Sequence, residues 1–338
     1  MLADVTEAND LAEGAMGTPH IYVHRVGDWY PLYMDPDNER RLRAFATVTS
    51  AGLVTEPPSP DQLVRDLAGV DGILSLNGIG APEITTEVLR SVGTVRVAAI
   101  AHWWHGGHVP ARAMWEAAGV EVIDASDPVT EAVVEWVVGT AILGVRRLVE
   151  FDRALKGGSA WAEPGRRDAG LLGASTIGII GLGRVGRVAA ARFRPFGARL
   201  IGYDPWLPAP DAAALGVRLV GLEELLRTAD VVSLHMPPTD ATRGMLGARE
   251  LGWLKDGAVL INSARAALLD EVAFIAELRS GRFRAFLDVF DDEPLPLDHP
   301  FRSLENVFIT PHIAGDTTGM FRSCARLALD RLRDYFAG

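Results

Sequence analysis

The chain has 338 residues, of which 48% are hydrophobic and 23% are charged, and its formal net charge at pH 7 is −11. This length allows two domains with separate cores, and the composition excludes a disordered chain. The acidic balance argues against a nucleic-acid partner, because such a partner requires a basic surface.

Cysteine content and apolar runs predict the cellular compartment of the protein. Cys324 is the only cysteine, which excludes an intrachain disulfide and fits a reducing compartment. The first residues lack the basic region and the apolar core of a secretory signal. The longest apolar run, Val133–Val145, contains Glu135 and is too short to span a bilayer. We therefore expect a cytoplasmic protein with no membrane partner.

The first third of the chain alternates strand-like and helix-like segments. Residues 1–18 are small and polar, which predicts a loose tail. Strands are expected at Ile21–Val26, Thr47–Thr49, Gly72–Leu76, Thr94–Ala101 and Val120–Ile123, and helices at Asn38–Phe45, Pro60–Ala68, Pro82–Ser91 and Val109–Ala118. This pattern predicts a small α/β layer, and it carries no phosphate-binding fingerprint.

The rest of the chain begins with a long apolar helix, expected from Thr130 to about Arg153, whose length suits a connection between domains. Further strands are expected at Thr176–Ile180, Arg199–Tyr203, Val231–Leu234, Ala258–Asn262, Ala285–Val289 and Val307–Thr310. Further helices are expected at Arg187–Phe196, Leu222–Arg227, Asp270–Ser280 and Thr317–Ala337. We expect the last helix to return to the first domain.

A dinucleotide fingerprint follows the first of these later strands, at Gly181, Gly183 and Gly186. Between a strand and a helix, such glycines allow a tight turn, close approach of a pyrophosphate and close helix packing. The next strand ends at Asp204, whose carboxylate suits the ribose hydroxyls of NAD and repels the 2′-phosphate of NADP. Because the fingerprint lies in the middle of the chain, we expect an NAD domain inserted in a second domain.

Three candidate catalytic side chains follow later strands of this domain: Arg265, Glu293 and His312. A guanidinium is always charged and binds a carboxylate through two hydrogen bonds. A buried Glu beside an imidazole stabilises its protonated form, so a proton donor persists near neutral pH. Taken singly, each residue has an ordinary structural explanation: a strand-end cap, an acidic surface loop or a satisfied core histidine.

Together these residues resemble the D-isomer-specific 2-hydroxyacid dehydrogenase family. The resemblance rests on five ordered stretches: 181–186 with 203–205, 233–239 with 242–244, 261–265, 287–290 with 293–294, and 310–315. It implies an α/β protein of two Rossmann-like, doubly wound domains. The NAD-binding domain, 129–311, is inserted in a substrate domain split into 19–128 and 312–338. It also implies a homodimer formed through the NAD domain.

The resemblance implies roles for single residues as well. Arg265 would bind the substrate carboxylate and oxo group, and His312, paired with Glu293, would donate the proton. The implied NAD-contacting positions, besides the fingerprint glycines and Asp204, are Arg184, Val185, Met236, Ala264, Asp288 and Gly315. The implied reaction is NAD(H)-dependent reduction of a small 2-oxo acid to the D-2-hydroxy acid.

Two positions depart from the family pattern. Ala266 stands where the family usually has Gly after the catalytic Arg. The short Gly-x-Asp turn of the substrate domain is replaced by His-Trp-Trp-His-Gly-Gly-His at 102–108, in which Gly106 aligns with the family's glycine. We expect the substrate pocket to be lined by Trp103, Trp104, His105 and Gly106. Packing at the domain interface is the alternative for this loop.

The same loop carries His102, His105 and His108, a spacing that raises the question of a metal. No Cys or clear carboxylate companion is nearby, and two consecutive glycines break any helix that would align the rings. We therefore expect no metal site.

Two other functions share these motifs. Formate dehydrogenase shares the implied fold but would place Gln at the position of Glu293. An NAD-sensing binding protein, like the corepressors of this family, retains the catalytic residues but has little turnover.

Overall fold

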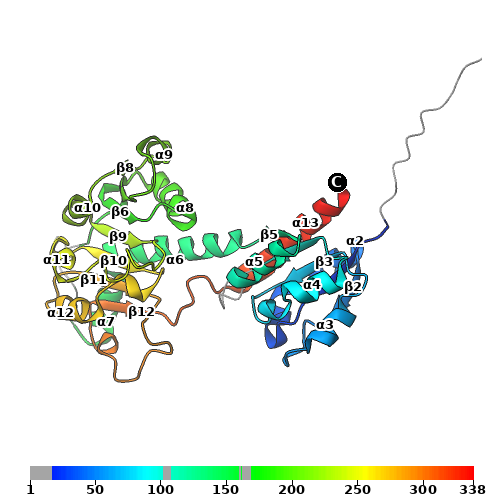
Figure 1. Ribbon diagram of the computed structural model, residues 1–338. Helices are drawn as coiled ribbons and strands as arrows, with labels where there is room; N and C mark the ends of the chain where they lie inside the picture. The colour runs from blue at the N-terminus through cyan, green and yellow to red at the C-terminus, as the bar shows by residue number, and fades with distance from the viewer. Residues whose placement is uncertain (1–16, 102–107, 160, 162–168) are drawn as a thin grey trace, which may run out of the picture. The chain divides into compact units, whose positions relative to one another are not determined.

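The structure, a computed structural model, describes residues 17–101, 108–159, 161 and 169–338. Its elements form two compact units (Figure 1). One contains the chain up to Asp127 together with Phe321–Gly338, and the other contains Pro128–Met320. The expected loose tail falls largely in residues 1–16, outside the described residues.

The first unit is built on a five-stranded parallel sheet in the order β2-β1-β3-β4-β5. Its strands are β1 His20–Val23, β2 Thr47–Ser50, β3 Gly72–Ser75, β4 Val97–Ile100 and β5 Glu121–Asp124. Its helices are α1 Tyr30–Tyr33, α2 Pro36–Phe45, α3 Pro60–Asp66, α4 Thr86–Val92 and α5 His108–Ala117, with short 3-10 turns at Gly27–Trp29 and Ala81–Glu83. The core is apolar and includes Trp115, whose buried indole N–H donates to the Ile84 carbonyl at 2.8 Å.

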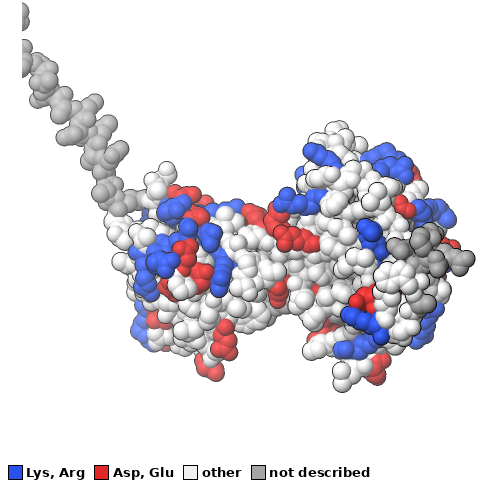
Figure 2. Space-filling model, turned by 180° about the vertical axis from the view of Figure 1, so that it is seen from behind, with Lys and Arg blue, Asp and Glu red and all other residues white. Residues whose placement is uncertain are grey.

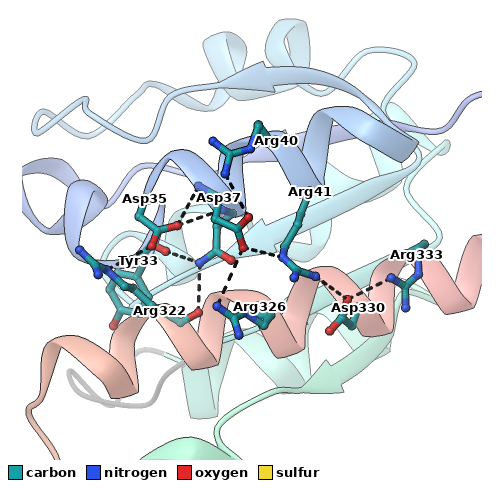
Figure 3. Close-up of polar contacts among 10 residues, drawn as sticks. Tyr33, Asp35, Asp37, Arg40, Arg41, Arg322, Arg326, Asp330 and Arg333 are labelled. Atoms are coloured by element: carbon teal, nitrogen blue, oxygen red, sulfur yellow. Dashed lines mark hydrogen bonds and ion pairs between the residues drawn. The ribbon is translucent and has the colours of Figure 1, made fainter.

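The C-terminal helix α13 (Thr318–Ala337) brings residues 321–338 back to the first unit, as expected. The buried Asn38 amide on α2 donates to the carbonyl oxygens of Tyr33 (2.7 Å) and Arg322 (3.0 Å). Around it, arginines and aspartates of α2 and α13 alternate in a network of ion pairs (Figure 3). Because exposed ion pairs contribute little, the buried amide is the more specific link between the two helices.

The second unit holds a seven-stranded sheet in the order β12-β11-β10-β9-β6-β7-β8, parallel throughout. Its strands are β6 Thr176–Ile180, β7 Arg199–Tyr203, β8 Arg218–Leu219, β9 Val231–Leu234, β10 Val259–Asn262, β11 Arg284–Leu287 and β12 Val307–Ile309. Its helices are α6 Asp127–Val145, α7 Leu148–Lys156, α8 Arg184–Phe193, α9 Ala209–Ala214, α10 Leu222–Thr228, α11 Ala248–Leu251 and α12 Glu271–Arg279. Four 3-10 turns complete it, at Leu172–Ala174, Arg194–Phe196, Ala266–Leu268 and Pro300–Arg302.

Both sheets are parallel and carry helices, which confirms the expected α/β architecture of two Rossmann-like units. The central strands are buried on both faces, which explains their mainly apolar sequences. On the face of the molecule drawn in Figure 2, acidic and basic side chains are intermingled.

The prediction of a single long helix from Thr130 to about Arg153 is wrong. The structure has two helices, α6 and α7, separated at Arg147, whose φ of 53° lies in the left-handed region. Its guanidinium lies 3.6 Å from Glu150 and over the Phe151 ring, contacts that accompany the unusual backbone. The sequence carries no signal for such a local break, because an arginine only rarely adopts the left-handed conformation.

The helix α6 is, within the described residues, the one helix long and apolar enough by length and composition to cross a membrane. Its Val134, Val137 and Ala141 side chains are fully buried in the core of the second unit. A Cβ at its Gly144 would lie 2.6 Å from a Val259 methyl group, so the helix packs closely on the sheet. These contacts are those of a core helix.

The second unit extends to Met320, beyond the boundary expected at Pro311. The reason is local: the amides of Ile313 and Ala314 donate to the Asp288 carboxylate at 2.9 and 2.7 Å. The segment after β12 is therefore fastened to the end of β11 before the chain leaves the unit.

Candidate functional site

The candidate residues of the second unit follow the carboxyl ends of neighbouring strands. The fingerprint follows β6, Met236 follows β9, Arg265 follows β10, Glu293 follows β11 and His312 follows β12. In the sheet, β6 lies between β7 and β9, so the strand order reverses at the fingerprint. Open α/β sheets bind their ligands at this edge, beside such a reversal.

The fingerprint glycines meet three different steric demands. Gly181 has a φ of +92°, and a Cβ there would lie 2.8 Å from the backbone of His235. A Cβ at Gly186 would lie 2.0 Å from the Gly181 carbonyl oxygen. Gly183, by contrast, has open space where a Cβ would stand. Gly181 and Gly186 therefore allow the turn and its close packing, and Gly183 leaves the approach to the helix N-terminus clear.

Helix α8 begins at Arg184, earlier than the expected Arg187, and its N-cap is Gly183, which offers no side-chain acceptor. The first backbone amides of this helix therefore lack a side-chain cap. Uncapped amides at the positive end of a helix bind phosphate well. This end of β6 and α8 fits the pyrophosphate of a dinucleotide.

Asp204 lies at the end of β7, close to the fingerprint turn. Its Oδ2 accepts a hydrogen bond from the Leu182 amide at 2.8 Å, and its Oδ1 accepts from the Trp206 amide at 3.0 Å. These bonds fix the orientation of the carboxylate while each oxygen keeps further acceptor capacity. The geometry suits two ribose hydroxyls.

Two further residues, Met236 and His235, pack beside the fingerprint turn. Met236 is buried, and its side chain lies beside Gly181. His235 has an Nε2 atom 2.9 Å from the Ser233 hydroxyl, and burial lowers the pKa of its imidazole to about 4. A neutral, hydrogen-bonded His235 is a packing residue at this position.

His312 and Glu293 come together across the ends of two strands. The imidazole Nδ1 of His312 lies 2.7 Å from Oε2 of Glu293, and the other carboxylate oxygen accepts from the Phe290 amide at 3.0 Å. The carboxylate is thus fixed by its own loop and in turn orients the ring. His312 itself has a φ of 55°.

The pair is not buried as the sequence led us to expect. The side chain of Glu293 is 37% exposed and that of His312 is 30% exposed. Both residues stand on loops beyond the last residues of their strands.

Arg265 stands on the loop after β10 and is exposed. The buried Asn262 fixes this loop, because its side chain donates to the Arg265 carbonyl and accepts from the Ala264 amide, each at 3.0 Å. The guanidinium donates to the Ala264 carbonyl at 2.6 Å. Within the described residues no carboxylate pairs with Arg265, so most of its donors remain available to an anionic ligand.

Asp288 has an internal role that the sequence did not reveal. It is 1% exposed, and it accepts hydrogen bonds from the Thr310 hydroxyl and from the amides of Ile313 and Ala314. Burial raises the pKa of this carboxyl group, and the bonds it accepts oppose that shift. Asp288 therefore holds the loop that carries His312, and Gly315 at the end of that loop packs against α6 with a Cβ position 3.3 Å from Val129.

A residue that sequence reasoning missed, Asp316, lies on the same loop. Its Oδ1 atom is buried and makes no hydrogen bond. Burial raises the pKa of this carboxyl group to about 6, the His312 charge lowers it, and the Asp288 charge raises it further. The only signal in the sequence is an acidic residue four positions after the candidate proton donor.

The expected substrate-pocket residues Trp103, Trp104, His105 and Gly106 lie outside the described residues, as does His102. The role of this loop therefore stays a prediction. Among the residues that the structure describes, which exclude that loop, no three His, Cys, Asp or Glu side chains are grouped so as to hold a metal ion.

Comparison with known proteins identifies the group to which these features belong. The family described as D-isomer specific 2-hydroxyacid dehydrogenase, NAD binding domain, matches residues 138–314. A glyoxylate reductase of Thermofilum pendens is 32% identical over 325 residues, which cover 94% of this chain and 91% of that protein. A solved phosphoglycerate oxidoreductase structure from Rhizobium etli has a TM-score of 0.74 at 25% identity, covering 91% of this chain and 92% of that one.

A D-3-phosphoglycerate dehydrogenase of Methanocaldococcus jannaschii is 35% identical over 222 residues, or 65% of this chain. The match covers 42% of that relative, and 38% of each of two further D-3-phosphoglycerate dehydrogenases. The chain thus matches less than half the length of these relatives. The cofactor of the matching domain family is NAD, which agrees with the open helix N-terminus and with Asp204.

Proposed function

This chain belongs to the D-isomer-specific 2-hydroxyacid dehydrogenase family, and we propose that it reduces a small 2-oxo acid to the D-2-hydroxy acid with NADH. The observation that carries the proposal is the 2.7 Å contact between His312 and Glu293 at the carboxyl edge of the fingerprint sheet. An oriented imidazole at this edge can give a proton to a carbonyl oxygen.

NADH, when bound, supplies the hydride that reduces the carbonyl carbon. Arg265 binds the substrate carboxylate, because its guanidinium has no carboxylate partner among the described residues and stays charged at every relevant pH. His312 donates a proton to the oxygen of the oxo group as negative charge develops there. Glu293 orients the ring and stabilises the imidazolium, and in the reverse direction His312 accepts the proton from the hydroxyl group.

The substrate class remains a 2-oxo acid of small size. The relatives are named for glyoxylate and for D-3-phosphoglycerate, which differ in whether the substrate carries a second anionic group. Trp103, Trp104 and His105 belong to the loop we expect to make this distinction.

A panel assay tests the proposal. The purified protein is mixed with NADH and, separately, with glyoxylate, pyruvate, the 2-oxo counterpart of 3-phosphoglycerate, phosphonate-bearing 2-oxo acids and bulkier 2-oxo acids. We expect saturable NADH oxidation with at least one of them. NADH binding without turnover across the panel would contradict the proposal and support an NAD-sensing protein.

We further propose that the protein is a cytoplasmic homodimer that pairs through the second unit. Helix α7 has no fully buried residue, and Leu148 and Leu155 on it are 43% and 50% exposed. Apolar side chains left exposed along one helix are typical of an interface between subunits. Light scattering should give the molar mass of a monomer for a Leu155→Asp variant and that of a dimer for the unmodified protein.

A further inference from the structure

Trp206 is an exposed aromatic residue at the carboxyl edge of the fingerprint sheet. It lies in the turn that follows β7, just after Asp204, and it is 65% exposed. Tryptophan is largely buried on average in folded proteins, so an exposed indole beside a ligand-binding edge calls for an explanation. Within the described residues this indole makes no hydrogen bond and stacks on no other ring. Its faces are therefore available to a ligand.

Contacts on both sides fix the turn that carries Trp206. Its backbone amide donates to Asp204 Oδ1 at 3.0 Å, while the Leu182 amide of the fingerprint donates to Oδ2 at 2.8 Å. The next residue, Leu207, is partly buried and packs against the apolar core of the second unit. The carboxylate of Asp204 thus lies between the fingerprint turn and the turn of Trp206.

This order matches the order of the groups in the adenosine half of NAD. The pyrophosphate fits the N-terminus of α8, and the 2′-hydroxyl of the adenosine ribose fits Asp204. The adenine is joined to the ribose carbon beside the one that carries this hydroxyl, and the pyrophosphate leaves the sugar on the opposite side. A ribose bound in this way would direct its base away from the fingerprint and toward the turn that carries Trp206.

An indole is well suited to hold such a base. Adenine has a flat π-face that stacks on aromatic side chains, and the stack removes apolar area of both rings from water. A tryptophan loses little conformational freedom on binding, because its side chain has only two torsions. Because the turn is already fixed, stacking costs little further ordering of the backbone.

We propose that Trp206 stacks on the adenine of NAD and holds the adenosine half of the cofactor. The proposal rests on the cofactor use in the function proposed above and is independent of which 2-oxo acid is reduced. Trp206 binds the cofactor at the end far from the reacting atoms. Its loss therefore weakens the binding of every adenosine ligand and leaves the chemical step unchanged.

Binding of etheno-ADP-ribose tests the proposal. This ligand carries the adenosine half of NAD without the nicotinamide, and its modified adenine is fluorescent. The full-length proteins compared are the unmodified protein, Trp206→Ala, Trp206→Phe, and Trp161→Ala as the control, since Trp161 is 77% exposed elsewhere in the same unit. Fluorescence anisotropy gives the Kd, and the emission at saturation reports whether an indole stacks on the base.

We expect Trp206→Ala to raise the Kd about 5–50-fold, the effect of losing one base–aromatic stack in an exposed site. Trp206→Phe should restore most of the affinity, whereas Trp161→Ala should bind within about twofold of normal. Emission should be quenched on binding to the unmodified protein and to Trp161→Ala, and much less on binding to Trp206→Ala. Melting temperatures should agree within about 2 °C, because both tryptophans are exposed.

No binding to the unmodified protein, a Kd within about twofold of normal in Trp206→Ala, or an equal loss in Trp161→Ala would overturn the inference. An unquenched base in the saturated unmodified protein would overturn it as well. Retained affinity with a changed molar mass of Trp206→Ala in light scattering would instead assign the indole to an interface between subunits. The measurement needs no substrate, so a failed substrate panel would overturn the proposed reaction and leave this inference intact.

Discussion

At the scale of single residues, the account depends on fixed charges with few alternative partners. Glu293 is held by the Phe290 amide and orients His312, while Arg265 is free of carboxylates within the described residues. In the proposed reaction, charge and orientation would therefore be set before a substrate binds, which is the condition for effective electrostatic catalysis.

Replacing the proton donor should reduce the rate and spare cofactor binding. We expect His312→Ala to lower the rate of reduction about 10²–10⁴-fold, the usual contribution of general acid catalysis. The Kd for NADH should stay within about twofold, because the dinucleotide fits at the other strands of the sheet. Single-turnover kinetics and NADH fluorescence titration measure the two quantities, and a rate within a few-fold of normal would exclude His312 as the donor.

Glu293→Gln is the milder companion variant. The amide keeps a hydrogen-bonding group beside the ring but no longer stabilises the imidazolium, so the pH optimum of reduction should move downward. A profile that coincides with that of the unmodified protein would show that the 2.7 Å contact does not couple the two groups.

Asp204 should determine the preference for NADH over NADPH. Its carboxylate is fixed by the Leu182 and Trp206 amides, and in the proposed binding mode of NAD it would occupy the place of a 2′-phosphate. We expect kcat/KM with NADH to exceed that with NADPH by at least about tenfold, since unfavourable pairing of like charges costs more than 1.4 kcal/mol. Asp204→Ser should reduce this preference, and equal efficiencies in the unmodified protein would contradict the assignment.

Asp316 should also make stability depend on pH. Its folded-state pKa is raised to about 6 from an ordinary value of 3.8, so the unfolded chain releases this proton first as the pH rises. The folded protein should therefore lose stability between about pH 4 and pH 6. Asp316→Asn should raise Tm at pH 7.5 and leave it unchanged at pH 4, and an equal Tm difference at both pH values would argue against a buried, ionising carboxyl group.

At the level of the secondary-structure elements, two glycines of the fingerprint turn are expected to serve different purposes: Gly186 is needed for folding and Gly183 for NADH binding. Gly186→Ala would place a Cβ 2.0 Å from the Gly181 carbonyl, whereas Gly183→Ala would place one in open space. Overpacking of this kind costs about 1–3 kcal/mol, so Gly186→Ala should lower Tm by several degrees. Gly183→Ala should leave Tm within about 2 °C and weaken NADH binding, because its methyl group would stand where the pyrophosphate approaches.

Thermal melts and NADH titrations of both variants measure these effects. A large loss of stability in Gly183→Ala would indicate that this glycine serves packing. Full NADH affinity in Gly183→Ala would mean that the pyrophosphate binds elsewhere.

Much of the element pattern was predictable, and the exceptions have physical reasons. Buried parallel strands such as β6 and β10 are continuous apolar runs bounded by glycine or polar residues, so their sequences are distinctive. The break at Arg147 was not predictable, because it depends on one left-handed residue and on contacts with Glu150 and Phe151. Propensity cannot reveal such a local tertiary effect.

At the scale of the whole molecule, motif order predicted the inserted NAD unit and the return of α13 to the first unit. The contact between Glu293 and His312 was predictable because both residues follow neighbouring parallel strands, whose carboxyl ends share one edge, and the assignment of Arg265 to the same site remains a prediction. The role of Asp288 was not predictable, because a carboxylate that accepts hydrogen bonds from backbone amides looks like any other carboxylate in a sequence.

The reaction itself is the most direct test of the account. The purified protein is incubated with excess NADH and the most active 2-oxo acid of the panel that gives a chiral product, and the product is analysed by chiral chromatography. The account predicts one D-2-hydroxy acid formed for each NADH consumed, with formation slowed about 10²–10⁴-fold in His312→Ala. Formation of the L-isomer, or equal rates in the two proteins, would contradict it.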